Sequence, residues 1–485
     1  MILALKYFFM KTAYPIYLGG VFTTTTKDLP VIFPYTNQPW TTAYLAGKEQ
    51  LEEAIQKAQA VENELKALPT YVRAEILLSI AQGLKDRHAE FTEALMLETG
   101  KPLFYARGEV DRAIFTFTDA AEETKRVYGE WLALDRAPSG ANHEAVVRRF
   151  PVGLVAAIAP FNFPLNLVAH KLAPAIAAGC PIIIKPASKT PISALLLAEL
   201  IDQTALPKGA VSVLPMDRAT GDQLVTDGRF KLLTFTGSPD VGWDMKNRAG
   251  KKKVVLELGG NAGLIVTPSA NMSKLLKKIG SAAFGQSGQS CIHTQRIYVH
   301  ENVREVFVTG LIDEAKKFVY GDPREENVMF SSMIDGANAD RIDAWVKEAV
   351  ADGAKVLYGG QRLSDTGYSP TILTATTKDM KVCSKEAFAP VVIVETYTDF
   401  KEAVRQINDS DFGLQCGVFT NNLEESTYAF EHLDVGGVVI NNVANFRADN
   451  MPYGGVKDSG LGREGVRYAI EDMTELKVLI VNKDF

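Results

Sequence analysis

Short apolar runs alternate with helical patterns between residues 153 and 237, and this alternation restricts the chain to a few folds. The apolar runs are GLVAAIAP (153–160), PIIIKP (181–186), AVSVLP (210–215) and KLLTFTG (231–237). The helical patterns between them include PLNLVAHKLAPAIAAG (164–179) and PISALLLAELIDQT (191–204). Strands that are apolar throughout are typical of parallel sheets covered by helices on both faces. The segment therefore predicts parallel βαβ units.

A second alternating series follows residue 257. Its predicted strands are AGLIVT (262–267), RIYVH (296–300), APVVIVETY (389–397) and CGVFT (416–420). Residues 47–134 instead repeat apolar positions at intervals of three and four, which is the periodicity of helices. The chain therefore predicts an α/β fold with two Rossmann-type units in sequence.

Two segments belong to neither series. HEAVVRRFPV (143–152) alternates and is predicted to be a protruding strand, and TELKVLIVN (474–482) reads as a terminal strand without a sequential partner. An uncovered terminal strand is a hazard for unwanted pairing. Our hypothesis is that residues 474–482 pair with the sheet of a neighbouring subunit, and the alternative is that they extend a sheet of their own chain.

Composition argues against several partners. The 485 residues carry a formal net charge of −6, which leaves no basic surface typical of nucleic-acid binding. No stretch approaches the roughly 18 consecutive apolar residues of a membrane span. The start MILALKYFFMKTAYP is interpreted as a short extension, with Met10 as an alternative first residue, rather than as a signal peptide.

The four cysteines point to a reducing compartment and to no metal site. Cys180, Cys291, Cys383 and Cys416 form no CxxC pair, so neither a zinc ribbon nor a thioredoxin-like motif is predicted. So few cysteines in so long a chain fit the cytoplasm. Three of them lie in or beside apolar strand patterns and are predicted to be inert. Cys291 alone lies among polar residues and glycines, in GQSGQSCIHT (285–294).

Cys291 is therefore the candidate nucleophile, in a loop that Gly285 and Gly288 are expected to make flexible. A thiol needs a nearby cation, base or helix terminus to react at neutral pH. His293 suggests a cysteine–histidine dyad, as in a cysteine hydrolase or acyltransferase. Side chains two positions apart stand side by side on an extended chain, which favours a structural role for His293.

Three further stretches have both a chemical and a structural interpretation. In FTGSPDVG (235–242), Ser238 and Pro239 suit a helix start that could face a pyrophosphate, or the stretch is an ordinary turn. In VLELGGNAG (255–263), Glu257 at a strand end is either a general base or a solvated turn residue. In APFNFPLNL (159–167), Asn162 is either a donor to an oxyanion or a helix cap.

Seven motifs in order then resemble one family. They are PFNFP, KPAS, FTGSPDVG, LELGGNAG, GQSGQSC, EAFAPV and MPYGGVKDSGLGREG. Their order and approximate spacing are similar to those of the aldehyde dehydrogenase superfamily from about residue 15 to the end. The nearest resemblance is to the lactaldehyde and non-phosphorylating glyceraldehyde-3-phosphate dehydrogenase branch.

This resemblance implies an aldehyde dehydrogenase fold with a small oligomerisation arm. It implies an NAD(P)-binding domain of residues 1–134 and 151–256 and a catalytic domain of residues 257–445. Residues 135–150 and 446–485 would form the arm and an anchor loop. A homodimer or homotetramer is expected.

The resemblance also implies the catalytic roles. Cys291 would attack an aldehyde, Asn162 with the Cys291 backbone N–H would stabilise the oxyanion, and Glu257 would activate the water that hydrolyses the thioester. The implied cofactor contacts are Pro160, Phe161, Lys185, Ser188, Gly237, Ser238, Leu258, Gly259, Glu386 and Phe388. NAD-specific relatives usually carry an acidic residue where this chain has Ser188, so NADP is expected to be accepted, alongside NAD or in its place.

For the substrate, two arginines are candidates to pair with an anionic or hydroxylated tail. These are Arg112 in a predicted helix and Arg447 in NFRADNMPYGG (445–455). Phe163, Ser290 and Ile292 are expected beside them. Phosphate-handling relatives tend to carry arginine at the position of Ser290, which argues against a phosphorylated substrate. The expected substrate is a short polar aldehyde such as lactaldehyde, with succinate semialdehyde and glyceraldehyde 3-phosphate as alternatives.

Overall fold

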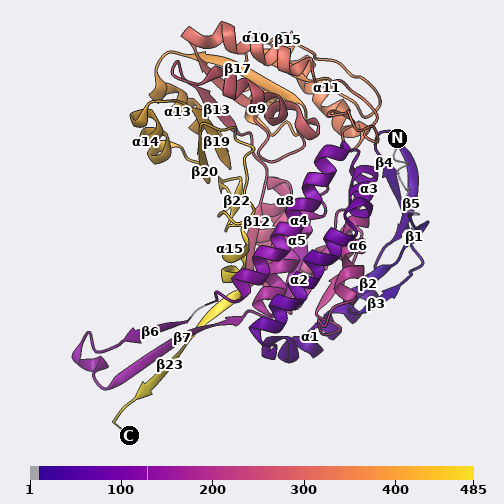
Figure 1. Ribbon diagram of the computed structural model, residues 1–485, viewed down its shortest axis with the longest axis vertical. Coiled ribbons are helices and arrows are strands. Elements are labelled where there is room, and N and C mark those ends of the chain that lie inside the picture. The colour runs from indigo at the N-terminus through magenta and orange to yellow at the C-terminus, as the bar shows by residue number, and fades with distance from the viewer. Residues whose placement is uncertain (1–9, 128, 485) are drawn as a thin grey trace.

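The computed structural model describes residues 10–127 and 129–484 and contains two large sheets, one in each half of the molecule (Figure 1). The first has eight strands in the order β22 (Gly460–Leu461), β12 (Lys253–Glu257), β11 (Leu232–Thr236), β8 (Val155–Ile158), β9 (Ile182–Lys185), β10 (Val211–Val213), β2 (Ile16–Leu18) and β3 (Val21–Thr23). The five strands from β12 to β10 are parallel, which confirms the predicted βαβ units.

Alternate residues of each central strand enter two different cores. In β8, Val155 and Ala157 pack into one cluster, whereas Ala156 and Ile158 pack into the other. Helices α2 (Thr70–Asp86), α3 (His88–Thr99), α4 (Leu103–Thr124), α5 (Asn166–Ala178) and α6 (Ile192–Asp202) cover the first face. Helices α1 (Lys48–Ala67), α7 (Arg218–Thr226) and α8 (Pro239–Arg248) lie on the second. Burial on both faces is why these strands are apolar throughout.

The second sheet has seven strands and begins after residue 262. Its order is β15 (Lys355–Tyr358), β16 (Thr371–Thr374), β17 (Val391–Tyr397), β14 (Arg296–His300), β13 (Gly263–Val266), β19 (Gln415–Phe419) and β20 (Gly437–Ile440). All are parallel except β15 at one edge. Its helices are α9 (Met272–Phe284), α10 (Arg304–Ala315), α11 (Gly336–Ala351), α12 (Lys381–Ser384), α13 (Phe400–Asn408) and α14 (Leu423–His432).

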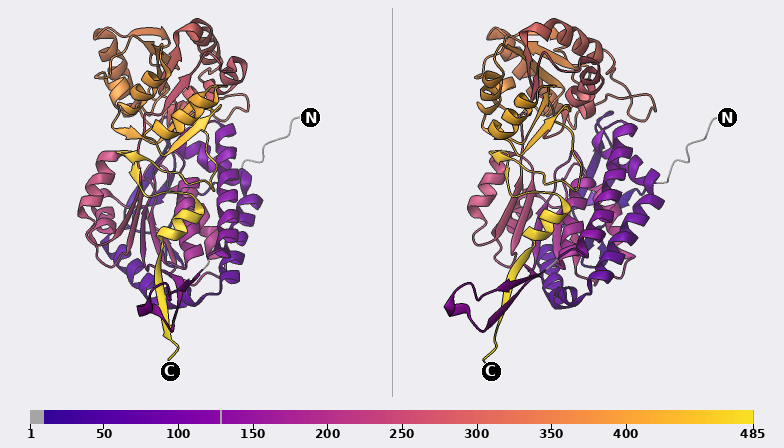
Figure 2. Two further views of the ribbon diagram at one scale, coloured as in Figure 1. Left: turned by 90° about the vertical axis from the view of Figure 1, so that its left-hand side faces the viewer. Right: turned by 60° about the vertical axis from the view of Figure 1, so that its left-hand side comes forward.

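The two segments that fitted neither series pair with each other. Strand β23 (Thr474–Asn482) runs antiparallel to β7 (His143–Pro151) along its whole length, and β6 (Glu130–Ala133) completes a three-stranded sheet that projects from the body (Figure 2). The terminal strand therefore has a partner in its own chain, and the hypothesis that it needs a neighbour for pairing is corrected. Pairing of its outer edge with another subunit stays a prediction, as do the domain boundaries.

Several short elements were not predicted. Strands β1 (Ala13–Tyr14), β4 (Asp28–Phe33) and β5 (Gln38–Tyr44) form a small sheet near the N-terminus, and β18 (Phe412–Gly413) pairs with β21 (Val456–Lys457). Helix α15 (Val466–Asp472) leads into β23. The helical interpretation of residues 47–134 is confirmed up to residue 124 and is wrong for β6. The alternatives for the start at Met1 or Met10 concern residues 1–9, which lie outside the described part.

Candidate active site

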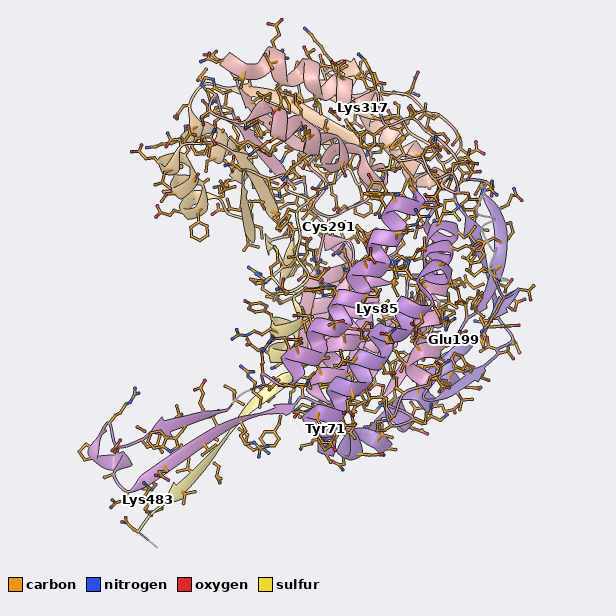
Figure 3. The ribbon with its side chains drawn as sticks, viewed as in Figure 1. Tyr71, Lys85, Glu199, Cys291, Lys317 and Lys483 are labelled. Atoms are coloured by element: carbon orange, nitrogen blue, oxygen red, sulfur yellow. The ribbon has the colours of Figure 1, made fainter. Side chains whose placement is uncertain are left out.

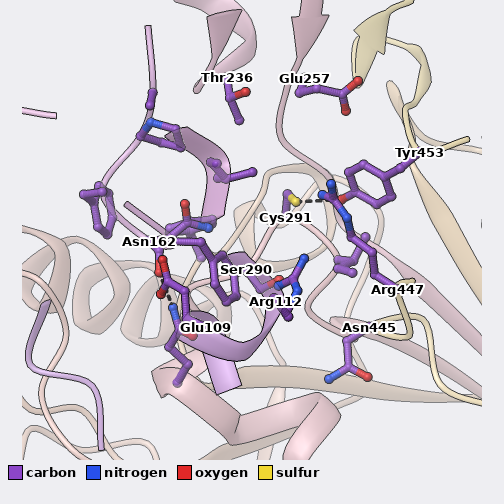
Figure 4. Close-up of a pocket in the computed structure, with 18 of the residues that line it drawn as sticks. Glu109, Arg112, Asn162, Thr236, Glu257, Ser290, Cys291, Asn445, Arg447 and Tyr453 are labelled. Atoms are coloured by element: carbon purple, nitrogen blue, oxygen red, sulfur yellow. Dashed lines mark hydrogen bonds between the residues drawn. The ribbon is translucent and has the colours of Figure 1, made fainter. Parts of the chain in front are cut away.

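A cavity of about 860 Å³ lies where the two large sheets face each other, and Cys291 is on its wall (Figures 3 and 4). Every predicted site residue lines this cavity except Lys185 and Ser188. The predicted residues come from the ends of β8, β11 and β12 in the first sheet, from loops of the second half and, for Arg112, from helix α4. The carboxyl ends of neighbouring parallel strands meet at one edge of a sheet, so residues far apart in the chain converge there.

The loop that carries Cys291 is packed rather than flexible. Gln286 and Ser287 adopt left-handed backbone angles, with φ of 51° and 55°, and both are buried. At Gly288, with φ of 68°, a Cβ atom would lie 2.1 Å from the carbonyl oxygen of Ala389. The expectation of a flexible loop is therefore wrong, because a glycine is needed here for close backbone packing.

The Cys291 sulfur has one polar side-chain contact among the described residues. Its Sγ lies 2.9 Å from the hydroxyl of Tyr453 (Figure 4). Burial raises the pKa of the thiol to about 11, the Tyr453 hydrogen bond lowers it, and the charge of Glu386 raises it. The geometry thus leaves the thiol largely protonated without a further stabilising charge.

Asn162 lies opposite this loop, and its side chain is directed toward the loop rather than into a helix cap. Its Nδ2 donates to the carbonyl oxygen of Gln289 at 3.2 Å. The backbone carbonyl oxygen of Asn162 accepts hydrogen bonds from Lys101 Nζ at 2.7 Å and Gln286 Nε2 at 2.6 Å. Glu109 pairs with Lys101 and accepts the backbone N–H of Leu165 at 2.9 Å. A buried ion pair thus fixes the backbone that presents the Asn162 amide.

Glu257 is the last residue of β12 and is almost completely buried. Its Oε1 accepts the Glu464 backbone N–H at 3.3 Å, and its Oε2 has no hydrogen-bond partner among the described residues. Burial and the neighbouring charge of Glu464 raise the pKa of Glu257 well above the usual value. For Glu464, Arg447 and Lys171 outweigh burial and hold the pKa at about 2. The surroundings therefore stabilise the charge of Glu464 and disfavour ionisation of Glu257.

Two arginines meet at another part of the wall through a shared carboxylate. Arg112 donates to Asp449 from Nε at 3.0 Å and from Nη2 at 2.7 Å. Arg447 Nη2 donates to Glu464 at 2.9 Å, and its Nε lies 3.4 Å from Asp449 without forming a hydrogen bond. His170 also binds Asp449 at 2.9 Å. The two arginines are thus oriented within the protein before any substrate is present.

The other end of the cavity fits a dinucleotide. Helix α8 begins at Pro239 with Ser238 as its N-cap, as predicted, and the Ser238 side chain makes no capping hydrogen bond. The first N–H groups of the helix are therefore available to an anion beside Gly237. At Gly259, a Cβ atom would lie 2.3 Å from a carboxylate oxygen of Glu386, so the glycine lets that side chain approach the wall.

Lys185 and Ser188 lie beside this wall rather than on it. Lys185 ends β9 and is paired in register with Ile158, which does line the cavity. Lys189 forms an ion pair with Asp335. The contacts of Lys185 and Ser188 with a cofactor stay predictions.

His293 and the three other cysteines, which were predicted to have structural roles, are buried. His293 is buried, and its Nε2 bonds to the carbonyl oxygen of Ala283 at 2.8 Å. Among the described residues the Cys291 sulfur bonds to Tyr453 and not to His293, so the structure lacks the dyad on which the hydrolase alternative depended. Cys180, Cys383 and Cys416 are buried, as predicted for inert thiols. The described residues contain no metal-binding cluster of histidine, cysteine, aspartate or glutamate, and none of their helices is long and apolar enough to cross a membrane.

Sequence reasoning missed several residues of the site, among them Tyr453, Glu464, Lys101 and Glu109. Tyr453 and Glu464 both lie in MPYGGVKDSGLGREG, which identified the family but assigned no role to either residue. Lys101 and Glu109 lie in helical patterns, where charged residues are usually solvated. Lys101 lies just before the first residue of α4, and Glu109 lies eight residues later, inside that helix. This spacing, which lets the two side chains form an ion pair beside the start of the helix, is the signal that could have identified the pair.

Comparison with known proteins identifies relatives along the whole chain. The aldehyde dehydrogenase family model matches residues 22–479. The 3-sulfolactaldehyde dehydrogenase of Priestia aryabhattai is 44% identical over 471 residues, covering 97% of this chain and 98% of that protein. The crystal structure of aldehyde dehydrogenase 21 from Physcomitrella patens, in complex with the reaction product succinate, has a TM-score of 0.96 at 44% identity and covers 98% of this chain and 99% of its own.

A third relative contains a cofactor. The structure of glyceraldehyde-3-phosphate dehydrogenase GapN from Methanocaldococcus jannaschii, complexed with NADP, has a TM-score of 0.90 at 37% identity and covers 95% of this chain and all of its own. These matches confirm both the fold and the resemblance drawn from the motifs. The chain belongs to the aldehyde dehydrogenase family, the NAD(P)-dependent enzymes that oxidise aldehydes.

Proposed function

We propose that Cys291 is the nucleophile of this aldehyde dehydrogenase. Its thiolate attacks the aldehyde carbon, and the Asn162 side-chain amide and the Cys291 backbone N–H stabilise the resulting oxyanion. Asn162 suits this role because Lys101 and Gln286 bind its backbone carbonyl oxygen and so fix the backbone from which the side-chain amide extends. A nicotinamide cofactor, when bound, supplies the hydride acceptor. Loss of hydride from the adduct leaves a thioester on Cys291.

Glu257 is the proposed base for the second half of the reaction. It takes a proton from water as the water oxygen attacks the thioester carbonyl, and the Cys291 sulfur leaves with the bond electrons. The Oε2 atom of Glu257 has no hydrogen-bond partner within the described part of the chain, which leaves it free to accept that proton. The product is a carboxylate and the free enzyme.

The proposed substrate is a short aldehyde with an anionic or hydroxylated tail, of the lactaldehyde type. Arg112 is the main support for this proposal. Its Nε and Nη2 donate to Asp449, and its Nη1 donors have no protein acceptor among the described residues, so they can bind a substrate tail. The side chain is 30% exposed and lines the cavity that holds Cys291. The relative named for 3-sulfolactaldehyde and the succinate-bound relative both support an anionic tail.

Substituting Arg112 tests the substrate class. For Arg112→Met we expect kcat/KM to fall about 10- to 100-fold for 3-sulfolactaldehyde or succinate semialdehyde, the cost of losing hydrogen bonds to a charged group. Propionaldehyde, which has no charged tail, should lose less than about threefold. Steady-state assays of Arg112→Met and of its control, Arg126→Met, with lactaldehyde and glyceraldehyde 3-phosphate complete the panel.

The matched control is Arg126→Met, an exposed arginine just beyond α4 that pairs with Glu122 and Glu123. It should leave every kcat/KM value unchanged. An equal loss for charged and neutral aldehydes in Arg112→Met would contradict recognition of an anionic tail by this side chain.

The proposed cofactor is NADP, alone or together with NAD. Residue 188, which follows strand β9, is a serine. An acidic side chain at this position would repel a 2′-phosphate, and serine would not. The GapN relative was crystallised with NADP. We expect kcat/KM for NADP to equal or exceed that for NAD with any accepted aldehyde, measured by formation of the reduced cofactor. A strong preference for NAD would contradict this proposal.

A homodimer or homotetramer is proposed through the projecting sheet of β6, β7 and β23. Apolar side chains on β23 are unusually exposed, among them Leu476 and Leu479 at 62% each. An exposed apolar strand of this length is expected to be covered by another chain.

A further inference from the structure

Tyr453 contacts the sulfur of Cys291 directly, although its sequence motif pointed to no chemical role. Its hydroxyl lies 2.9 Å from Sγ, and Figure 4 shows the tyrosine beside Cys291 with its hydroxyl directed at the sulfur. Tyr453 is 3% exposed, and this contact is the one hydrogen bond that its hydroxyl makes within the described part of the chain. Buried polar groups are normally hydrogen-bonded. Among the described residues, this hydroxyl meets that requirement through the proposed nucleophile alone.

The ring of Tyr453 is held in place from two sides. Its backbone N–H donates to the carbonyl oxygen of Glu464 at 2.9 Å and its carbonyl oxygen accepts the Glu464 N–H at 2.6 Å. The guanidinium of Arg447 lies over the ring, 3.9 Å from its centroid. The Glu464 carboxylate in turn binds Arg447. The hydroxyl therefore cannot turn away from Cys291 without breaking this packing.

We propose that Tyr453 is a catalytic residue whose hydroxyl donates a hydrogen bond to the Cys291 thiolate and increases the fraction of enzyme able to attack the aldehyde. A thiolate can only accept, so the tyrosine must be the donor once the sulfur is ionised. Hydrogen bonds to charged acceptors are stronger than those to neutral ones, so the contact favours the thiolate over the thiol. The proposal rests on the proposed role of Cys291 as nucleophile.

The charged groups around the pair agree with a donor role for the hydroxyl. Burial raises the pKa of Tyr453 well above its usual value and the charge of Cys291 adds to that, so the hydroxyl keeps its proton. Glu386 and Glu257 face the sulfur and disfavour the thiolate, whereas Arg447 favours it. Arg447 and Glu257 also act on Tyr453. Among these groups, Tyr453 is the one that bonds to the sulfur.

The test is the rate at which iodoacetamide alkylates Cys291 between pH 7 and 12, measured on the Cys291 peptide by mass spectrometry. Tyr453→Phe keeps the ring and its Arg447 contact and removes the hydroxyl alone. We expect the apparent pKa of the alkylation profile to rise by about one to two units. Since a more basic thiolate is also more nucleophilic, the rate at a fixed pH should fall about 3- to 15-fold. The kcat/KM for the best aldehyde should fall by a similar factor.

A structural effect would look different. If the substitution loosened the cavity, the thiol would be more exposed and the alkylation rate would rise at every pH. If the apparent pKa of the profile did not change, Tyr453 would have no part in thiolate formation, whether the rate itself fell or stayed the same. Any of these results would overturn the proposal. Tyr71→Phe, on the exposed surface of α2, is the control for losing a tyrosine hydroxyl and should reproduce the wild-type profile.

Aldehyde turnover by Cys291→Ala, compared with the alkylation profile of Tyr453→Phe, separates this proposal from the proposed function. If Cys291→Ala retains full aldehyde turnover, the nucleophile is another residue and the proposed function fails. If Cys291→Ala is inactive but Tyr453→Phe keeps the wild-type profile, the nucleophile stands and the role of Tyr453 is excluded.

Discussion

Replacing Cys291 with alanine is expected to abolish aldehyde oxidation, with a loss in kcat on the order of 10⁶-fold, as for other covalent nucleophiles. Without the sulfur, no tetrahedral adduct forms at the aldehyde carbon and no hydride can leave it. The measurement is formation of the reduced cofactor in the presence of the best aldehyde of the panel. Alanine removes little volume from the wall, so the fold should be retained.

Cofactor binding distinguishes chemical loss from misfolding. Cys291→Ala should bind NADP with wild-type affinity, measured by quenching of tryptophan fluorescence. Cys383→Ala is the matched control, because Cys383 is a buried thiol outside the cavity wall, and it should keep turnover within about threefold. Turnover by Cys291→Ala at more than about 1% of the wild-type rate would contradict the assignment of the nucleophile.

Replacing Glu257 with glutamine is expected to stop the enzyme after one turnover. Hydride loss does not need this base, but hydrolysis of the thioester does, and a general base typically contributes 10²- to 10⁴-fold. We therefore expect a rapid burst of about one reduced cofactor per active site, followed by a steady state about 10²- to 10⁴-fold slower than the wild type. Rapid-mixing absorbance measurements resolve the two phases.

The pH dependence gives an independent check on Glu257. Burial and Glu464 raise its pKa, and only the deprotonated carboxylate can accept a proton from water. The rate of thioester hydrolysis should therefore increase as the pH rises through this elevated pKa. Glu257→Gln should lose that dependence. Absence of a burst in the variant would show instead that Glu257 acts before or during hydride loss.

The parallel sheets were predictable because burial on both faces leaves a clear record in the residues. Strand β8 is apolar throughout, since its neighbouring residues enter two different cores. The short strands β1 and β3 leave no such record, because they lie at sheet edges and are only partly buried. The pairing of β23 with β7 joins residues more than 320 positions apart, a distance over which apolar patterning contains no information on register.

The reactive side chains were predictable from the motifs, but their surroundings were not. Cys291, Glu257 and Asn162 were identified from the residues next to them and from the family resemblance. The rigidity of the Cys291 loop was not, because its buried hydrogen bonds come from distant segments. Ser287, for example, donates to the carbonyl oxygen of Ser331 at 2.7 Å. Tyr453 was missed for the same reason, since its contact with the sulfur exists only after the two sheets meet.

The reacting groups are divided between the halves of the molecule. Glu257 ends β12 and Asn162 follows β8 of the eight-stranded sheet, whereas Cys291 lies on the loop before β14 of the other sheet. Neither half alone holds both the attacking atom and the groups that complete the reaction. Chemical competence therefore requires that both halves are folded and in contact with each other.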